Sequence, residues 1–290
     1  MTTPNTQNDA NTIVVYHAHC CDGQGAAAAF YTKHPEATYF PGAYNRELTD
    51  FTGKDVYFVD FSCRLNVLKN ILEVANSVTI IDHHKTAIDE LKDFEHPKFT
   101  KVFDLNHSGA VLTWKWLWPE REVPQILSLI EDRDLWRFNI SGTKEINAYL
   151  YSLEFDIQQW ADVFLDAESF RLCATEMIAS GISLLRQDAK RVASLLRNAR
   201  MMRIGGLLTP TVNCNGFHAS DVGHELAKGK FFAATYYDTP RGRTFSLRAS
   251  DDSTADVSAI ARTYGGGGHM TAAGFTVPFD VAYNMEVRES

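Results

Sequence analysis

Three short apolar runs, each followed at once by polar side chains, constrain the fold of this chain more than any other feature. They read IVVY at 13–16, VYFV at 56–59 and VTII at 78–81. Their β-branched and aromatic residues are typical of strands buried in a parallel sheet. Segments with Ala, Leu and charged residues at helical spacing follow them, at 23–34, 64–76 and 86–94. This alternation predicts an α/β domain with a parallel sheet over residues 13–165.

The pattern changes after this domain. A stretch from about 156 to 203 has helical spacing and almost no glycine or proline, so we expect a long helix that breaks near Gly181 and ends at Gly205–Gly206. Residues 166–203 then form a helical connector, and a smaller α/β domain is predicted over 204–290. Its expected strands lie at 231–237 and 244–250, and its expected helices lie at 220–228 and 256–264.

Composition limits the class of protein. The 290 residues carry 36 acidic and 28 basic side chains, and the net charge of −8 argues against a protein that grips long nucleic acid. The five cysteines are scattered, with two of them adjacent, which suits a reducing compartment better than a framework of disulfides. No apolar run is long enough for a membrane span, and the first dozen residues are polar. We expect a disordered lead-in over 1–12, no membrane partner and a cytoplasmic protein.

Carboxylates and imidazoles follow all three predicted strands. His17, Cys20 and Asp22 come after the first strand, Asp60 after the second, and Asp82, His83 and His84 after the third. The carboxyl ends of parallel strands meet at one edge of a sheet, where ligands bind. One such residue by itself is more often a helix cap, but three strand ends with the same chemistry favour a site. These donors suit Mn²⁺, with Mg²⁺ as the alternative, and a central carboxylate can bridge two ions.

Two further segments and an arginine carry candidate residues, and each has a structural alternative. The acidic residues of Glu131–Asp134 offer another carboxylate, although beside Arg133 they also fit a solvated face. The run Gly265–Gly268 before His269 can cradle an anion with its backbone N–H groups, or it can end a helix. Arg248, in an expected strand, either contacts a phosphate or lies in solvent.

Taken together, these segments resemble one known family. The chain contains His17…Cys20…Asp22-Gly23, VDFS, Asp82-His83-His84, SGAVLTWKW, EDRDLW and GGGGHMTAAGF, in this order. They are similar to the motifs of the DHH phosphoesterase superfamily with a C-terminal DHHA1 domain, in its oligoribonuclease-like branch. The most specific pair is Asp-His-His at a strand end and Gly-Gly-Gly-His about 185 residues later. The resemblance implies a two-domain hydrolase with its active site in the cleft between the domains.

The resemblance also implies which residues bind metal. Carried over position by position, the ligands of two Mn²⁺ ions would be His17, Asp22, Asp60, His83 and Asp132. Asp60 would bridge the ions. Many relatives have a second acid where this chain has Cys20, so Cys20 takes a ligand place in this interpretation. Asp134 is the alternative to Asp132, because the EDRD spacing leaves the alignment open by two residues.

The remaining roles are divided between the two domains. Successive side chains of a strand point to opposite faces, so we expect His83 to face the metal, His84 to face the reacting phosphate and Asp82 to orient an imidazole. The resemblance implies that the second domain holds the substrate. Its binding residues would be Arg248, Gly266, Gly267, Gly268 and His269.

The expected activity is hydrolysis of a phosphodiester by a metal-activated water. The resemblance implies short oligonucleotides or small nucleotides as substrates, such as a 3′,5′-bisphosphorylated adenosine or a cyclic dinucleotide. The acidic balance argues against long strands. A nucleotide-binding module without catalysis is the first alternative, because of Cys20, and a pyrophosphatase is the second. The sequence leaves a monomer and a homodimer both open.

Overall fold

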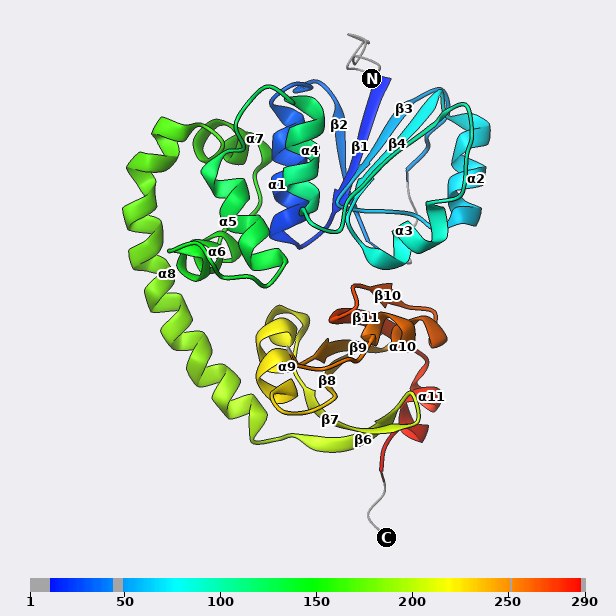
Figure 1. Cartoon of the computed structure of the whole chain (residues 1–290), viewed down its shortest axis with the longest axis vertical. Helices are drawn as coiled ribbons and strands as arrows, with labels where there is room; N and C mark the ends of the chain where they lie inside the picture. Colours follow the sequence, from blue (N-terminus) through cyan, green and yellow to red (C-terminus); the bar gives the residue numbers. More distant parts are fainter. Residues whose placement is uncertain (1–10, 44–48, 251, 288–290) are drawn as a thin grey trace. The chain divides into compact units, whose positions relative to one another are not determined.

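The chain divides into two units, which are described separately. In the computed structural model they comprise Met1–Leu185 and Arg186–Ser290 (Figure 1). The structure describes residues 11–43, 49–250 and 252–287. Of the lead-in expected over 1–12, residues 1–10 lie outside the described residues, and Thr12 already belongs to the first strand.

The first unit is built on a five-stranded sheet in which every strand is parallel to its neighbours, in the order β2-β1-β3-β4-β5. The strands are β1 Thr12–His17, β2 Thr38–Gly42, β3 Asp55–Val59, β4 Ser77–Asp82 and β5 Phe99–Phe103. The three central strands are the three apolar runs, so the predicted parallel α/β sheet is confirmed. We did not predict the edge strands, because β2 contains Pro41 and Gly42 and β5 contains the polar Thr100 and Lys101.

Helices cover both faces of this sheet (Figure 1). They are α1 Cys21–Tyr31, α2 Leu65–Val74, α3 Lys85–Leu91, α4 Gly109–Leu117, α5 Gln125–Asp134, α6 Thr143–Tyr151, α7 Ile157–Gln159 and a π-helix at Trp160–Phe164. Val14 and Val59 pack in the same core as residues of α1, α4 and α5. Val15 and Phe58 pack in another core with residues of α2 and α3. Adjacent strand residues thus point into different cores, as the alternation of strand side chains requires.

One helix, α8 (Ala167–Leu196), runs through the predicted connector, and it is continuous where we expected a break near Gly181. A Cβ atom on Gly181 would lie 2.0 Å from the carbonyl oxygen of Glu145 in α6. The glycine therefore allows α8 to pass close to the α6 backbone. Residues 200–203 of the predicted connector are not helical, because they belong to strand β6. In the described parts of the chain, no helix is both long and apolar enough to cross a membrane.

The second unit holds a mixed six-stranded sheet in the order β10-β11-β9-β8-β7-β6. Its strands are β6 Arg200–Ile204, β7 Leu207–Asn213, β8 Phe232–Thr239, β9 Gly242–Ala249, β10 Gly267–Gly268 and β11 Ala272–Val277. Its helices are a 3-10 turn at Gly216–His218, α9 Ala219–Ala227, α10 Val257–Thr263 and α11 Phe279–Asn284. The predicted α/β class of this unit is confirmed. Gly205 and Gly206, which we expected to end a helix, instead form the β6–β7 turn with φ angles of 57° and 80°.

Candidate metal centre

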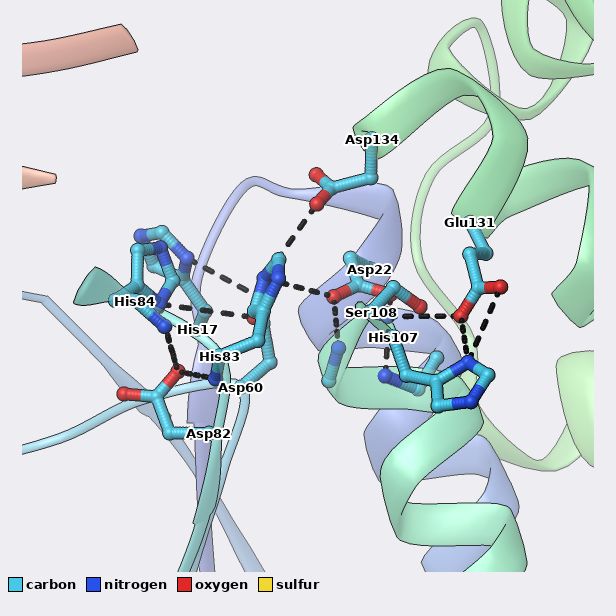
Figure 2. A network of polar contacts seen from close by, with 12 residues as sticks. His17, Asp22, Asp60, Asp82, His83, His84, His107, Ser108, Glu131 and Asp134 are labelled. Carbon is cyan, nitrogen blue, oxygen red and sulfur yellow. Dashed lines mark hydrogen bonds and ion pairs between the residues drawn. The ribbon is translucent and has the colours of Figure 1, made fainter. Parts of the chain in front are cut away.

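Polar residues of the first unit meet where three neighbouring strands end (Figure 2). His17 ends β1, Asp60 follows β3, and Asp82 ends β4 with His83 and His84 directly after it. Because β1, β3 and β4 are adjacent and parallel, their carboxyl ends bring these side chains together. Asp22 joins them from the first turn of α1.

Asp60 lies at the centre of this group. Its φ is +52°, in the left-handed region that residues other than glycine rarely adopt, and its side chain is 1% exposed. Oδ1 lies 3.2 Å from Nε2 of His83, and Oδ2 lies 3.4 Å from Nδ1 of His17. Neither oxygen makes a well-formed hydrogen bond to a described residue. Burial alone would raise the pKa of Asp60, but the imidazoles of His17, His83 and His84 hold this pKa well below its usual range.

Gly109 leaves the space that Asp60 occupies. It is the first residue of α4, and a Cβ atom there would lie 2.4 Å from Cβ and 2.7 Å from Cα of Asp60. Helix α4 can therefore begin directly against Asp60 only because Gly109 has no side chain. We assigned no role to Gly109 from the sequence. The available signal was Ser108 before an apolar run, which marks a helix start, and Ser108 is the N-cap of α4.

Asp22 is held by the N-terminus of α4. Its Oδ2 accepts a hydrogen bond of 2.6 Å from the N–H of Gly109, and its Oδ1 accepts one of 3.1 Å from the N–H of Ala110. The helix dipole favours a negative charge at this end. Nevertheless, burial and then the negative charges of Asp60 and Asp134 raise the pKa of Asp22 well above its usual value. These carboxylates repel one another unless a cation lies among them.

His83 contacts three of the carboxylates. Its Nε2 lies 3.6 Å from Oδ2 of Asp22, 3.2 Å from Oδ1 of Asp60 and 3.4 Å from Oδ2 of Asp134. Burial lowers the pKa of His83, but the close contact with Asp60 and the negative charges of Asp134, Asp60 and Asp22 outweigh burial and raise this pKa to about 10. The surrounding carboxylates thus stabilise the protonated, positively charged form of this imidazole.

The donor atoms of the first unit fall into three overlapping sets. They are Asp22, His83 and Asp134; His17, Cys20 and Asp60; and Asp60, Asp82, His83 and His84, and within each set the donor atoms lie within 4.8 Å of one another. Two ligand atoms that each lie about 2.1 Å from one divalent ion are about 3.0 to 3.5 Å apart. The carboxylate–imidazole separations here, from 3.2 to 3.6 Å, match that spacing. These residues therefore fit divalent cations.

The thiol of Cys20 is the weakest donor of the second set. Burial, and then the negative charges of Asp60, Asp134 and Asp22, raise the pKa of Cys20 well above its usual value. An ion must therefore displace the proton of this thiol before Cys20 can act as a ligand, because a neutral thiol binds Mn²⁺ or Mg²⁺ poorly. The expected ligand role of Cys20 stays a prediction.

Asp134 and Asp132, the two alternatives for the last carboxylate ligand, face different surroundings. Oδ2 of Asp134 faces His83, whereas the carboxylate of Asp132 accepts hydrogen bonds from the chain after α5. Its donors are the N–H groups of Asn139 and Ile140 and the hydroxyl of Thr143. Neighbouring helical residues differ by about 100° in direction, so positions two apart in α5 differ by about 200°. Asp134, and not Asp132, therefore lies beside the other candidate donors, and metal binding by either residue stays a prediction.

Asp82 fixes the ring of His84. Nδ1 of His84 lies 2.7 Å from Oδ1 of Asp82, and the other oxygen of Asp82 accepts a hydrogen bond from the hydroxyl of Ser62. Burial would raise the pKa of Asp82, but the charge and the hydrogen bond of His84 lower it. Asp82 therefore lies where it can orient the imidazole. Its part in catalysis and the role of His84 toward a phosphate stay predictions.

A second polar network supports the start of α4, and we did not predict it. Glu131 of α5 accepts a hydrogen bond of 2.8 Å from the N–H of Ser108, and its carboxylate lies 3.1 Å from Nδ1 of His107 (Figure 2). The Glu131 carboxylate thus ties α5, which supplies Asp134, to the helix end that holds Asp22. Glu131 therefore acts on the candidate metal centre only by positioning Asp134 and Asp22.

The substrate residues predicted in the second unit have defined partners there. Arg248 donates a hydrogen bond of 2.7 Å to the hydroxyl of Ser220. A Cβ atom on Gly266 would lie 2.1 Å from a carbonyl oxygen of β11, so the glycine run permits close packing against that strand. Substrate binding by Arg248, Gly266, Gly267, Gly268 and His269 stays a prediction.

Comparison with known proteins gives two sequence relatives and a similar fold, while no family model matches. An uncharacterized protein of Acanthamoeba polyphaga mimivirus is 30% identical over 292 residues, which cover 92% of this chain and 67% of that protein. Oligoribonuclease NrnB of Bacillus subtilis is 24% identical over 245 residues, which cover 77% of this chain and 58% of NrnB. Among solved structures, the DHH domain of a member of the s1p family of ribosomal proteins has a TM-score of 0.55 at 15% identity. That match covers 92% of this chain and 83% of the other chain, and it shows a shared fold.

Proposed function

Because this chain belongs to the DHH phosphoesterase superfamily, we propose that it is a metal-dependent phosphodiesterase that hydrolyses short oligonucleotides or small nucleotides. Membership rests on the motifs at the strand ends, the DHH-domain fold and the sequence relatives. The name of the Bacillus subtilis relative, an oligoribonuclease, supports a nucleic acid substrate. The net charge of −8 supports a short one, because long strands are gripped by many basic side chains.

The observation that carries the proposal is the position of Asp60 between two sets of donor atoms. Its Oδ1 faces His83 and its Oδ2 faces His17, so one carboxylate serves both sets. Asp22, Asp60, His83 and Asp134 would hold one ion, and His17 and Asp60, with Cys20, would hold the other. When bound, two Mn²⁺ or Mg²⁺ ions would lower the pKa of a water molecule and polarise the phosphoryl oxygens.

His84 supplies a further part of the proposed mechanism. Asp82 fixes its ring through Nδ1, at 2.7 Å. An N–H at the other ring nitrogen, Nε2, would donate to a phosphoryl oxygen and stabilise the charge that develops there. No side-chain nucleophile is needed, since a water molecule attacks the phosphorus.

The second unit is proposed to hold parts of the substrate remote from the reacting phosphorus. Arg248 and His269 would contact phosphate oxygens of the substrate. Binding of these oxygens can be measured separately from the rate of the chemical step. Replacing either residue with alanine should raise KM for nucleotides far more than KM for bis(p-nitrophenyl) phosphate. Equal losses on both substrates would contradict this division.

One panel of substrates tests the proposed function. Purified protein would be incubated with Mn²⁺, Mg²⁺ or a chelator and with dinucleotides to pentanucleotides, bisphosphorylated adenosine, cyclic dinucleotides and pyrophosphate. We expect mononucleotide products from the short substrates with Mn²⁺ and none with the chelator. Activity that survives complete removal of metal would refute the mechanism, and cleavage of pyrophosphate alone would identify a pyrophosphatase.

A second candidate function is nucleotide binding without turnover. The protonated thiol of Cys20 favours it, because the second set of donors then has fewer good ligands for an ion. Under this alternative, calorimetry detects binding of a dinucleotide, while no product forms with any of the metals. Turnover with Mn²⁺ would rule the alternative out.

A further inference from the structure

The six residues after α5 form a loop with an unusual backbone, and it starts directly behind Asp134. We call this segment, Leu135–Ile140, the aromatic loop. Trp136 and Phe138 have φ angles of +56° and +53°, in the left-handed region that bulky side chains rarely adopt. Such conformations persist only where surrounding contacts fix them, and they gather at functional sites.

Asp132 provides those contacts. Its backbone carbonyl accepts hydrogen bonds from the N–H groups of Arg137 and Phe138, at 2.8 and 3.2 Å. Its carboxylate accepts three more, from Asn139, Ile140 and Thr143, at 2.8, 3.0 and 2.6 Å. The backbone carbonyl and the carboxylate of one buried aspartate thus both hold the second half of the loop. The loop is held in a fixed shape beside a residue of the metal centre.

The two aromatic rings of this loop contact each other and cations. The ring centroids of Trp136 and Phe138 lie 4.9 Å apart at an angle of 76°. The guanidinium of Arg133 lies 4.2 Å from the centroid of Trp136, and the ammonium of Lys144 lies 4.8 Å from that of Phe138. The result is a small surface that is both aromatic and positively charged.

The two rings of the aromatic loop are not part of a hydrophobic core of the described residues. Trp136 and Phe138 are half-buried, and neither belongs to, nor packs against, a hydrophobic core cluster among the described residues. By contrast, Trp114 lies in the core of the first unit and Trp116 and Trp118 pack against it. Core packing therefore accounts for the presence of Trp114, Trp116 and Trp118. It does not account for the presence of Trp136.

We propose that the aromatic loop is the platform on which a nucleobase of the substrate stacks. This inference rests on the proposed function, and it names nucleobase-bearing phosphodiesters as the substrate class. Aromatic rings and guanidinium groups stack on any base, because every base has a π-face. Trp136 lies two residues after Asp134 in the chain, which places the start of the aromatic loop next to a residue of the candidate metal centre. The enzyme accordingly selects nucleotides without reading their sequence.

The test compares a dinucleotide with its abasic analogue, which has the same sugars and phosphodiester but no bases. Trp136→Gly removes the ring and suits the left-handed backbone, whereas Trp136→Phe keeps an aromatic ring. We expect Trp136→Gly to raise KM for the dinucleotide by roughly 5- to 150-fold, the range for loss of one base stack. KM for the abasic analogue should stay within about two-fold, and Trp136→Phe should restore most of the loss. Metal content in all variants should equal that of the wild type.

The possible failures are distinguishable. Equal losses on both substrates, or loss of bound metal, would show that Trp136 only supports Asp134 and would overturn the platform. An unchanged KM for the dinucleotide would do the same. A wild-type protein that cleaves neither substrate would count against the proposed function, and calorimetry would then decide the platform. The platform is supported if Trp136→Gly binds the dinucleotide more weakly than the wild type does and binds the abasic analogue equally well. It is refuted if the variant and the wild type bind the dinucleotide equally.

Discussion

Replacing Gly109 with alanine would put a methyl group where the structure has Asp60. The new Cβ would lie 2.4 Å from Cβ of Asp60 and 2.7 Å from its Oδ1. Elsewhere in a helix the same change is stabilising, by about 1 kcal/mol, because glycine loses more backbone entropy on folding. At Gly109 the contact with Asp60 reverses that expectation.

The size of the effect follows from the contacts. Ordinary contacts of a Cβ atom begin at 3.4 Å, so Asp60 or the start of α4 must move by about 1 Å, and crowding of this kind costs about 1 to 3 kcal/mol. The helix propensity of alanine offsets part of this cost, which leaves a loss of stability of about 0 to 2 kcal/mol. Activity should suffer more, because a shift of about 1 Å at a reacting centre can lower kcat by about 100-fold. Asp22 is affected as well, since it is bound to the N–H of Gly109.

The assay measures three quantities on purified Gly109→Ala: urea unfolding, Mn²⁺ affinity by calorimetry, and kcat on a dinucleotide. Gly216→Ala is the matched control. It also lies at the first residue of a short helix, and its Cβ would lie no closer than 3.4 Å to another atom. We expect the control to keep the Mn²⁺ affinity and kcat of the wild type. If Gly109→Ala binds Mn²⁺ and turns over substrate as the wild type does, the steric reasoning about Asp60 is incorrect.

Four further outcomes are expected. Asp60→Ala should abolish turnover and lower the metal content found by elemental analysis while circular dichroism still reports a folded chain; normal metal content would remove the bridging assignment. Cys20→Asp should tighten Mn²⁺ binding, since carboxylate oxygen suits this ion better than sulfur, and Cys20→Ser should weaken it; the reverse order in metal titrations would show that Cys20 only packs. Glu131→Ala should cost about 1 to 3 kcal/mol in urea unfolding, because the N–H of Ser108 loses its partner, and Glu131→Gln, which keeps an acceptor, should restore most of this; equal losses in the two variants would contradict the role of that hydrogen bond. Since the pKa of His83 is raised to about 10, Mn²⁺ must displace its proton, so affinity measured by calorimetry should rise by up to about ten-fold per unit of pH between 6 and 9; an affinity independent of pH would contradict this.

The central strands, and most of the residues that meet at their ends, could be predicted from the sequence. A run such as VTII is β-branched throughout and largely apolar, which is typical of a strand buried on both faces of a parallel sheet. The chain then leaves the sheet, so Asp82 and His83 necessarily lie at its carboxyl edge. Both inferences depend on residues close together in the sequence, and for that reason they needed no tertiary structure.

Other features depend on which distant residues come into contact, and these only the tertiary structure decided. The choice of Asp134 over Asp132 depends on how α5 is rotated about its axis, and packing sets that rotation. From the sequence alone, a glycine within a helical pattern predicts a break in the helix. The structure shows instead that Gly181 lies against a carbonyl oxygen of α6, where a side chain would not fit. The importance of Gly109 was hidden for the same reason: Asp60, 49 positions earlier in the sequence, occupies the space that a side chain would need. Steric exclusion acts between atoms that folding brings together. The sequence around one residue does not show which distant residues these will be.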